Sequence, residues 1–151
     1  MLVLYGGTSS ERDVSTQSGE AVLCALQASV EQELLDASID SIFIQPDGRW
    51  LWRGETSTEE ECISRLPKDC VVFNALHGGR GEGGDIQLAL NKAGIKYTGS
   101  GPQASELCMN KSAARESLIA AGLLCAEGLL ITSLPEGQSS ATELLNALQG
   151  L

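Results

Sequence analysis

Two short apolar runs in this sequence each end in glycines that lead into a helix-forming segment. The first run is Leu2–Tyr5, followed by GGTSSERDVS, and the second is Cys70–Asn74, followed by ALHGGRGEGGD. Runs this short and this apolar are typical of buried strands. Glycine permits a sharp turn at the end of a strand, because it adopts positive φ without strain. The pattern predicts two strand–turn–helix units, and such turns at the carboxyl ends of strands are where open α/β sheets bind ligands.

The rest of the chain continues to alternate between strand and helix patterns. A first helix is predicted over residues 10–28, and further strands are predicted at 41–45, 49–53, 95–97 and 129–132. Further helices are predicted at 56–66, 83–93, 102–121 and 141–148. Strands separated by helical segments of this length form a mostly parallel sheet that helices cover on both faces. The predicted fold class is therefore α/β, with a Rossmann-like sheet, and Trp50 and Trp52 are expected to pack on one face of their strand.

Composition excludes several classes of protein. The 151 residues can bury the core of one domain, and ten basic residues against twenty acidic ones give a net charge of −10. This balance argues against nucleic-acid and anionic-membrane partners, which need a basic surface. The five cysteines form no C-x-x-C pair, which disfavours a zinc knuckle and fits a reducing compartment. Because no apolar run approaches a membrane span and no secretory signal is present, we expect a cytoplasmic protein.

Two residues in the glycine turns are candidates for function, and each has two interpretations. Glu11 could be a first-turn carboxylate that complements the helix dipole, or it could receive a substrate ammonium. Ser10 with Asp13, or Thr8 with Glu11, fits a capping box. His77, the only histidine, could be a structural group at a strand end or a site residue to which the flanking glycines admit a ligand.

The second turn also contains the spacing Gly79-x-Gly81-x-x-Gly84, which satisfies the dinucleotide fingerprint. That fingerprint requires an acidic residue at the end of the next strand, and here the strand is followed by Thr98-Gly99-Ser100. A Walker-type phosphate loop would need lysine and a hydroxyl where Asp85 and Ile86 stand. A dinucleotide-binding Rossmann module therefore remains the alternative interpretation.

Three blocks of sequence together resemble one family. They are GGTSSERDVSTQSG, FNALHGGRGEGGDIQ, and KYTGSGPQAS with MNKSAAR. Their order and spacing are similar to those in the N-terminal region of D-alanine–D-alanine ligases, over about Leu2 to Gly122. The resemblance implies a pre-ATP-grasp domain of an enzyme that joins two D-alanines for peptidoglycan synthesis, with hydrolysis of ATP to ADP and phosphate. The chain departs from the family at Gly83, where an aspartate is usual.

The resemblance assigns roles to four residues. It implies that Glu11 holds the ammonium of the first D-alanine, that Val14 contacts its methyl group and that His77 lines the same subsite, so that Glu11 and His77 are the catalytic candidates. Lys111 is implied to reach toward the nucleotide. No metal ligand is predicted in this chain, because ATP and Mg²⁺ are bound mainly by the ATP-grasp domains.

The expected domain organisation follows from the same resemblance. Residues 1–131 are predicted to form the pre-ATP-grasp N-terminal domain, and residues 132–151 a linker and the start of the next domain, with the ATP-grasp domain itself absent. Expected partners are D-alanine, the ATP-grasp domains in cis or in trans, and a second copy in a homodimer of the full enzyme. The isolated chain is expected to be inactive. A non-catalytic relic or interaction domain remains a third possibility.

Overall fold

The computed structural model describes residues 1–128, 130 and 145–146. It divides into two compact units, Met1–Met109 and Asn110–Leu151, and the first holds the sheet. In the second unit, helix α6 (Lys111–Ala120) is capped by Asn110, whose side chain accepts a hydrogen bond from the Ala113 N–H. The strand expected at 129–132 and the helix expected at 141–148 lie outside the described residues, apart from Leu130, Leu145 and Asn146. Across the described part of the chain, no helix has the length and apolar character that a membrane crossing requires.

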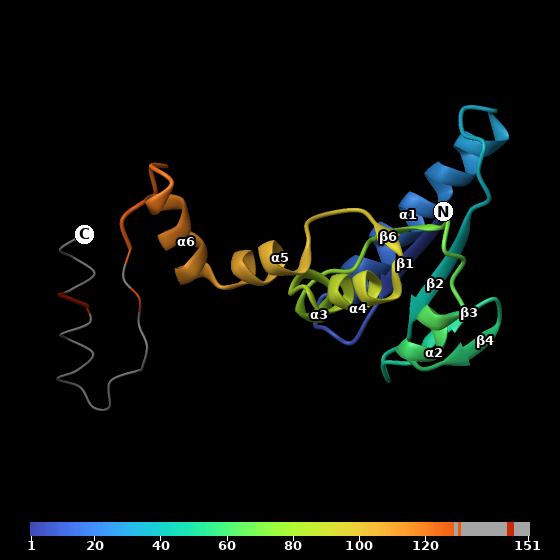
Figure 1. The fold of residues 1–151 in the computed structure, drawn as a ribbon, viewed down its shortest axis with the longest axis horizontal. Helices are drawn as coiled ribbons and strands as arrows, with labels where there is room; N and C mark the ends of the chain where they lie inside the picture. The colour runs from blue at the N-terminus through green and yellow to red at the C-terminus, as the bar shows by residue number, and fades with distance from the viewer. Residues whose placement is uncertain (129, 131–144, 147–151) are drawn as a thin grey trace. The chain divides into compact units, whose positions relative to one another are not determined.

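The first unit is built on a six-stranded sheet with the order β4-β3-β2-β1-β5-β6 (Figure 1). The strands are β1 (Leu2–Gly6), β2 (Asp40–Ile44), β3 (Trp50–Trp52), β4 (Glu55–Ser57), β5 (Val71–Asn74) and β6 (Lys96–Tyr97). Strand β1 pairs in parallel with β2 and β5, and β5 pairs in parallel with β6, whereas β3 and β4 are antiparallel. The predicted mostly parallel α/β sheet is confirmed.

Helices cover both faces of this sheet, because side chains alternate along β1. On one face lies α1 (Arg12–Glu31), which approaches so closely that a Cβ at Gly19 would be 2.3 Å from the Tyr5 Cβ. On the other face, Leu2 and Leu4 join a core cluster with α2 (Glu59–Ser64) and α4 (Asp85–Ala93). The most deeply buried members of this cluster are Leu4, Ile42, Trp50, Cys62, Val72, Ile86 and Leu90.

The structure corrects the predicted helix at 56–66. Helix α2 begins at Glu59, because the Thr58 hydroxyl accepts a hydrogen bond from the Glu61 N–H and the Glu61 carboxylate accepts one from the Thr58 N–H. The residues before it, Glu55–Ser57, form strand β4 after a two-residue turn. In that turn Arg53 and Gly54 have φ of 52° and 82°, the positive values of a type I′ hairpin turn. Arginine is not a usual residue for that conformation, so the hairpin was difficult to predict from the sequence.

Asp40 anchors this hairpin to β2. Its Oδ2 accepts hydrogen bonds from Trp52 Nε1 at 3.0 Å and Arg53 Nε at 2.8 Å, and Trp50 and Trp52 are buried on the predicted common face. Partial burial of Asp40 raises its pKa, but the hydrogen bonds from Arg53, the Ser41 N–H and Trp52 outweigh this effect, so that the pKa is lowered. The carboxylate form of Asp40 is therefore favoured by folding.

The five cysteines are free thiols. Cys62 is buried in the core cluster, and desolvation raises its pKa. Burial raises the pKa of Cys70 in the same way. These two cysteines therefore act as small apolar side chains.

Candidate functional site

The two predicted glycine turns meet where the order of strands reverses. From β1 the chain passes through α1 to β2 on one side, and it later crosses to β5 on the other side of β1. The connections that follow β1 and β5 consequently diverge. In open α/β sheets this topological switch point is the place where ligands bind.

Ser15 holds the two strands together at this point. The Ala75 N–H donates to the Leu4 carbonyl at 2.9 Å, after which the regular β1–β5 ladder ends. The next bond of a parallel ladder would join the Gly6 N–H to the Ala75 carbonyl. The Ser15 hydroxyl stands between them instead: it accepts from the Gly6 N–H at 2.9 Å and donates to the Ala75 carbonyl at 2.8 Å. Ser15 is fully buried, and its insertion opens the crevice between the strand ends while keeping both backbone groups bonded.

The glycines of the second turn are explained by close packing. A Cβ at Gly81 would lie 2.3 Å from the Leu76 Cβ, and one at Gly84 would lie 2.5 Å from the Pro102 carbonyl oxygen. Gly78 has φ of +67°, and a Cβ there would come within 3.1 Å of the Glu11 Oε2. In the spacing that matches a dinucleotide fingerprint, Gly81 and Gly84 are therefore explained by close packing and Gly79 by its φ of +48°, reasons that involve no nucleotide. Between Gly78 and Gly83 the chain forms a short helix, α3 (Gly79–Glu82), which the sequence did not predict.

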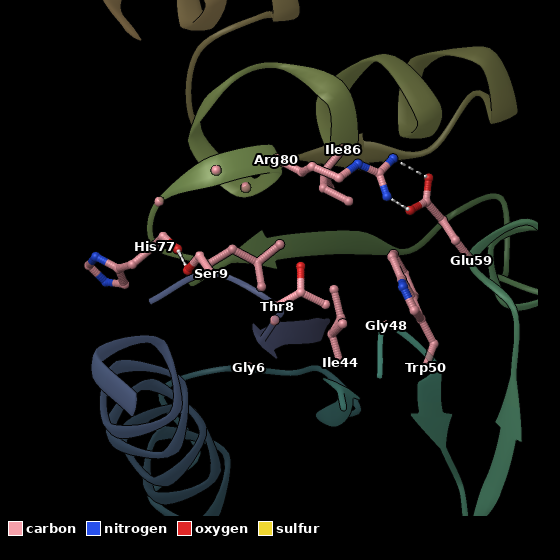
Figure 2. A pocket seen from close by; sticks show the side chains of 15 residues that line it. Gly6, Thr8, Ser9, Ile44, Gly48, Trp50, Glu59, His77, Arg80 and Ile86 are labelled. Atoms are coloured by element: carbon pink, nitrogen blue, oxygen red, sulfur yellow. Dashed lines mark hydrogen bonds and ion pairs between the residues drawn. The ribbon is translucent and has the colours of Figure 1, made fainter. Parts of the chain in front are cut away.

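A pocket of about 310 Å³ opens between the two turns (Figure 2). Thr8 and Ser9 line it from the first turn, residues 76–81 line it from the second, and Ile44, Trp50 and Ile86 give it an apolar floor. Arg80 and Glu59 form a two-pronged ion pair in its wall, with N–O distances of 2.8 Å and 3.2 Å. Hydrogen bonding to Glu59 raises the pKa of Arg80, so this guanidinium remains charged. The pocket thus combines an apolar floor with hydroxyl, backbone and ion-paired groups at its rim.

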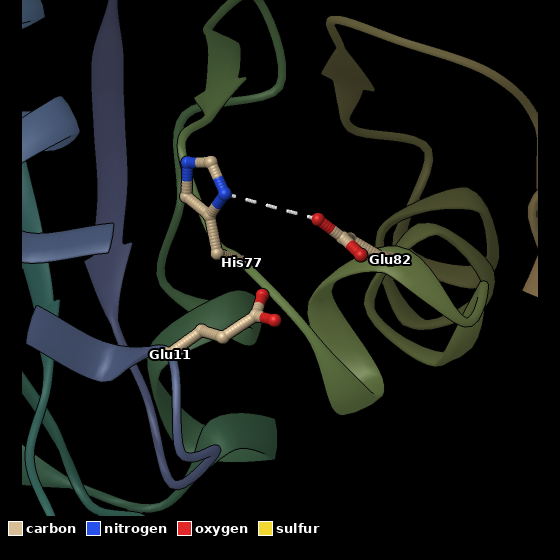
Figure 3. A group of neighbouring side chains, drawn as sticks. All are labelled: Glu11, His77 and Glu82. Atoms are coloured by element: carbon tan, nitrogen blue, oxygen red, sulfur yellow. Dashed lines mark ion pairs between the residues drawn. The ribbon is translucent and has the colours of Figure 1, made fainter. Parts of the chain in front are cut away.

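The carboxylate of Glu11 lies beside Glu82 and beside His77, which lines this pocket (Figure 3). One potential ligand atom from each of the three residues lies within 4.8 Å of the others. The His77 Nδ1 is 3.8 Å from the Glu82 Oε1, which is an electrostatic contact and too long for a hydrogen bond. Two carboxylates and an imidazole in this arrangement can receive a cation, either an ammonium group or a metal ion. Glu82 was not predicted, because it comes from a different turn and its spacing from Glu11 carries no metal-binding pattern.

The side chain of Glu11 makes no capping hydrogen bond to α1, and the predicted capping box is wrong. The helix begins at Arg12, Glu11 is its N-cap residue, and no side chain makes a capping hydrogen bond there. The turn is fixed instead by Ser9, whose hydroxyl accepts from the Glu11 N–H at 3.2 Å and donates to the His77 carbonyl at 2.7 Å. Among the residues that the structure describes, no hydrogen bond or ion pair reaches the Glu11 carboxylate. It is therefore available for a ligand.

The structure brings together some of the predicted site residues. Glu11 and His77 are neighbours, although only His77 lines the pocket. Val14 lies in the first turn of α1 with 50% of its surface exposed, so within this unit it is available to a ligand but is not buried against the pocket. Lys111 is the first residue of α6 in the second unit, where it lines a pocket with Arg115 and Glu116. Its role toward a nucleotide remains a prediction.

Comparison with known proteins identifies relatives of the chain. It is 41% identical over 133 residues to the D-alanine–D-alanine ligase of Granulibacter bethesdensis, and 43% identical over 130 residues to that of Gluconobacter oxydans. These alignments cover 87% and 86% of the chain but 38% of each relative, so the chain spans well under half the length of the ligases that it matches. No protein-family model matches it.

Solved structures give the same result for the fold. The chain superposes on the D-alanine–D-alanine ligase of Aeromonas hydrophila with a TM-score of 0.69 and 28% identity, covering 97% of this chain and 55% of that one. The D-alanyl-alanine synthetase A of Vibrio cholerae shares the fold at a TM-score of 0.71 and 23% identity, with 99% of this chain and 44% of that one covered. The chain is thus homologous to the N-terminal part of the D-alanine–D-alanine ligases, as the three blocks of its sequence predict.

Proposed function

We propose that this chain is the part of a D-alanine–D-alanine ligase that binds the first D-alanine. The observation that carries the proposal is the Glu11 carboxylate, which stands unpaired among the described residues, next to His77 at the switch point of the sheet. An α-ammonium group has three N–H donors and a positive charge, and a carboxylate is its natural partner. Val14, exposed one turn further on α1, would contact the methyl group of the amino acid.

Phosphoryl transfer requires more than this chain contributes. Formation of a D-alanyl phosphate from ATP needs Mg²⁺ and cationic side chains that stabilise the charge on the transferred group. We assign these functions to the ATP-grasp domains of the full enzyme, with Lys111 of this chain reaching toward the nucleotide. In the same proposal the full enzyme is a cytoplasmic homodimer that supplies the dipeptide of peptidoglycan, and residues 1–131 are its pre-ATP-grasp domain.

A chimeric enzyme tests the proposal. Residues 1–128 would replace the homologous segment of the Gluconobacter oxydans ligase, and phosphate release would be measured with ATP, Mg²⁺ and D-alanine. Glu11→Gln should raise the KM of the first D-alanine about ten- to a hundredfold, the effect of losing one charge-assisted hydrogen bond. Glu31→Gln is the matched control, because Glu31 is the last residue of the same helix and lies away from the site. An active chimera in which both variants have the parental KM would refute the role of Glu11.

The alternative functions make different predictions for the unmodified chain. A dinucleotide-binding module would bind NAD or NADP in a calorimetric titration, whereas the ligase assignment predicts no such binding. A non-catalytic relic would give a folded chimera that releases no phosphate, while the parent ligase remains active. The homologues favour the ligase assignment over both.

A further inference from the structure

Ser18 contacts the imidazole of His77 from helix α1. The Ser18 Oγ lies 3.2 Å from the His77 Nε2, and the contact joins residues that are 59 positions apart. Ser15 and Ser18 are three residues apart, so they lie on the same face of α1. Ser15 binds the Ala75 carbonyl and Ser18 binds the ring two residues further along the chain. The helix therefore fixes both the backbone that carries His77 and the orientation of its ring.

The other ring nitrogen of His77 faces negative charge. The Nδ1 lies 3.8 Å from the Glu82 Oε1 (Figure 3), and the Glu11 carboxylate belongs to the same cluster. A nitrogen lone pair directed at a carboxylate is repelled, whereas an N–H is attracted. Neutral imidazole carries one proton, so a proton on Nδ1 leaves Nε2 as an acceptor. A serine hydroxyl can donate to that acceptor, and 3.2 Å allows the bond.

We propose that Ser18 is a positioning residue that holds neutral His77 in the Nδ1–H tautomer, with this N–H directed toward the carboxylates of Glu82 and Glu11. The consequence for binding rests on the proposed function. With the imidazole fixed in this way, the Nδ1–H of His77 stays directed at the carboxylates, and the Glu11 carboxylate accepts the D-alanine ammonium on its other side. Without the Ser18 hydroxyl, the ring is free to rotate and to exchange its proton between the two nitrogens.

The single histidine makes the tautomer directly measurable on the 151-residue chain. In a chain labelled with ¹⁵N-histidine, long-range ¹H–¹⁵N correlation spectra at pH 8.5 report which nitrogen carries the proton. We expect the Nδ1–H form in the parent chain, a shift toward the Nε2–H form in Ser18→Ala, and recovery in Ser18→Thr, which retains a hydroxyl. Ser29→Ala is the matched control, because the Ser29 hydroxyl of the same helix bonds only its own helix, at the Ala25 carbonyl.

Two results would overturn the proposal at this stage. One is an Nε2–H tautomer in the parent chain, and the other is an unchanged tautomer in Ser18→Ala. Backbone amide spectra of each variant show whether the fold is retained, and if Ser18→Ala does not fold, Ser18→Cys provides a second variant with a weaker donor. This measurement requires no D-alanine, so it remains decisive even if the proposed function fails.

The chimeric ligase tests the consequence for binding. Ser18→Ala should raise the KM of the first D-alanine about two- to tenfold, the range that loss of one neutral hydrogen bond gives, with a smaller change in kcat. Ser29→Ala should leave both constants at the parental values. A changed tautomer together with an unchanged KM would show that Ser18 orients the ring without serving the amino-acid site, and the proposal would then be wrong.

Discussion

Replacing Ser15 by alanine removes the hydroxyl that joins the ends of β1 and β5. The substitution leaves the Gly6 N–H without its acceptor and the Ala75 carbonyl without its donor, and Ser15 is fully buried. An orphaned buried polar group costs about 1–3 kcal/mol, so two of them should lower the free energy of unfolding by about 2–4 kcal/mol, allowing for partial relaxation. Because small domains are stable by only about 5–15 kcal/mol, this loss is a large fraction of the total.

Urea unfolding followed by tryptophan fluorescence measures this loss. Trp50 and Trp52 are 1% and 6% exposed, so unfolding changes the environment of both fluorophores. For a urea m-value of about 2 kcal/mol/M, which is typical of small proteins, the midpoint of Ser15→Ala should fall by about 1–2 M. Ser29→Ala should leave the midpoint nearly unchanged, because its hydroxyl bonds only to a carbonyl one turn earlier in α1. A shift below about 0.3 M in Ser15→Ala, at an unchanged m-value, would refute the argument that this hydroxyl replaces a ladder hydrogen bond.

Measurements on His77, on the isolated chain and on Asp40 test the site and the attachment of the hairpin to β2. In the chimeric ligase, His77→Gln should lower turnover or D-alanine affinity while the urea midpoint is retained; normal kinetics with a lowered midpoint would make His77 a structural residue. The isolated chain should release no phosphate from ATP with D-alanine and Mg²⁺, and turnover above a no-enzyme blank would contradict this. The lowered pKa of Asp40 means that its contribution to stability is present above the unfolded-state value of about 3.8 and is lost as the pH falls through the folded-state pKa. The urea midpoint of Asp40→Asn should therefore fall less between pH 7 and pH 2 than that of the parent chain, and equal falls would refute the role of Asp40.

Short-range signals in the sequence were sufficient to identify much of the fold. The apolar runs at Leu2–Tyr5 and Cys70–Asn74, each with a glycine turn behind it, correspond to β1 and β5. The helix predicted at 83–93 is α4, which begins at Asp85 after Gly84 in the left-handed conformation. These elements are predictable because strand burial and helix starts depend on residues that are neighbours in the sequence. The hairpin of β3 and β4 was missed because its turn places a non-glycine residue, Arg53, at positive φ.

The full set of residues in the candidate site could be identified only from the tertiary structure. The amino-acid pattern alone predicted that two glycine turns follow buried strands, and the sequence motifs indicated Glu11, Val14, His77 and Lys111. The sequence could not indicate Glu82, Ser18, or the ion pair of Glu59 and Arg80. Glu82 meets Glu11 from the other glycine turn, and Ser18 and Glu59 each contact a residue of a distant element. The strand order places β1 beside β5. Because these two strands are adjacent, Glu11 lies close to His77, and the Ser15 hydroxyl lies between the ends of the strands. A pattern of neighbouring residues specifies which surfaces are buried, whereas the packing of α1 on the sheet specifies which side chains meet.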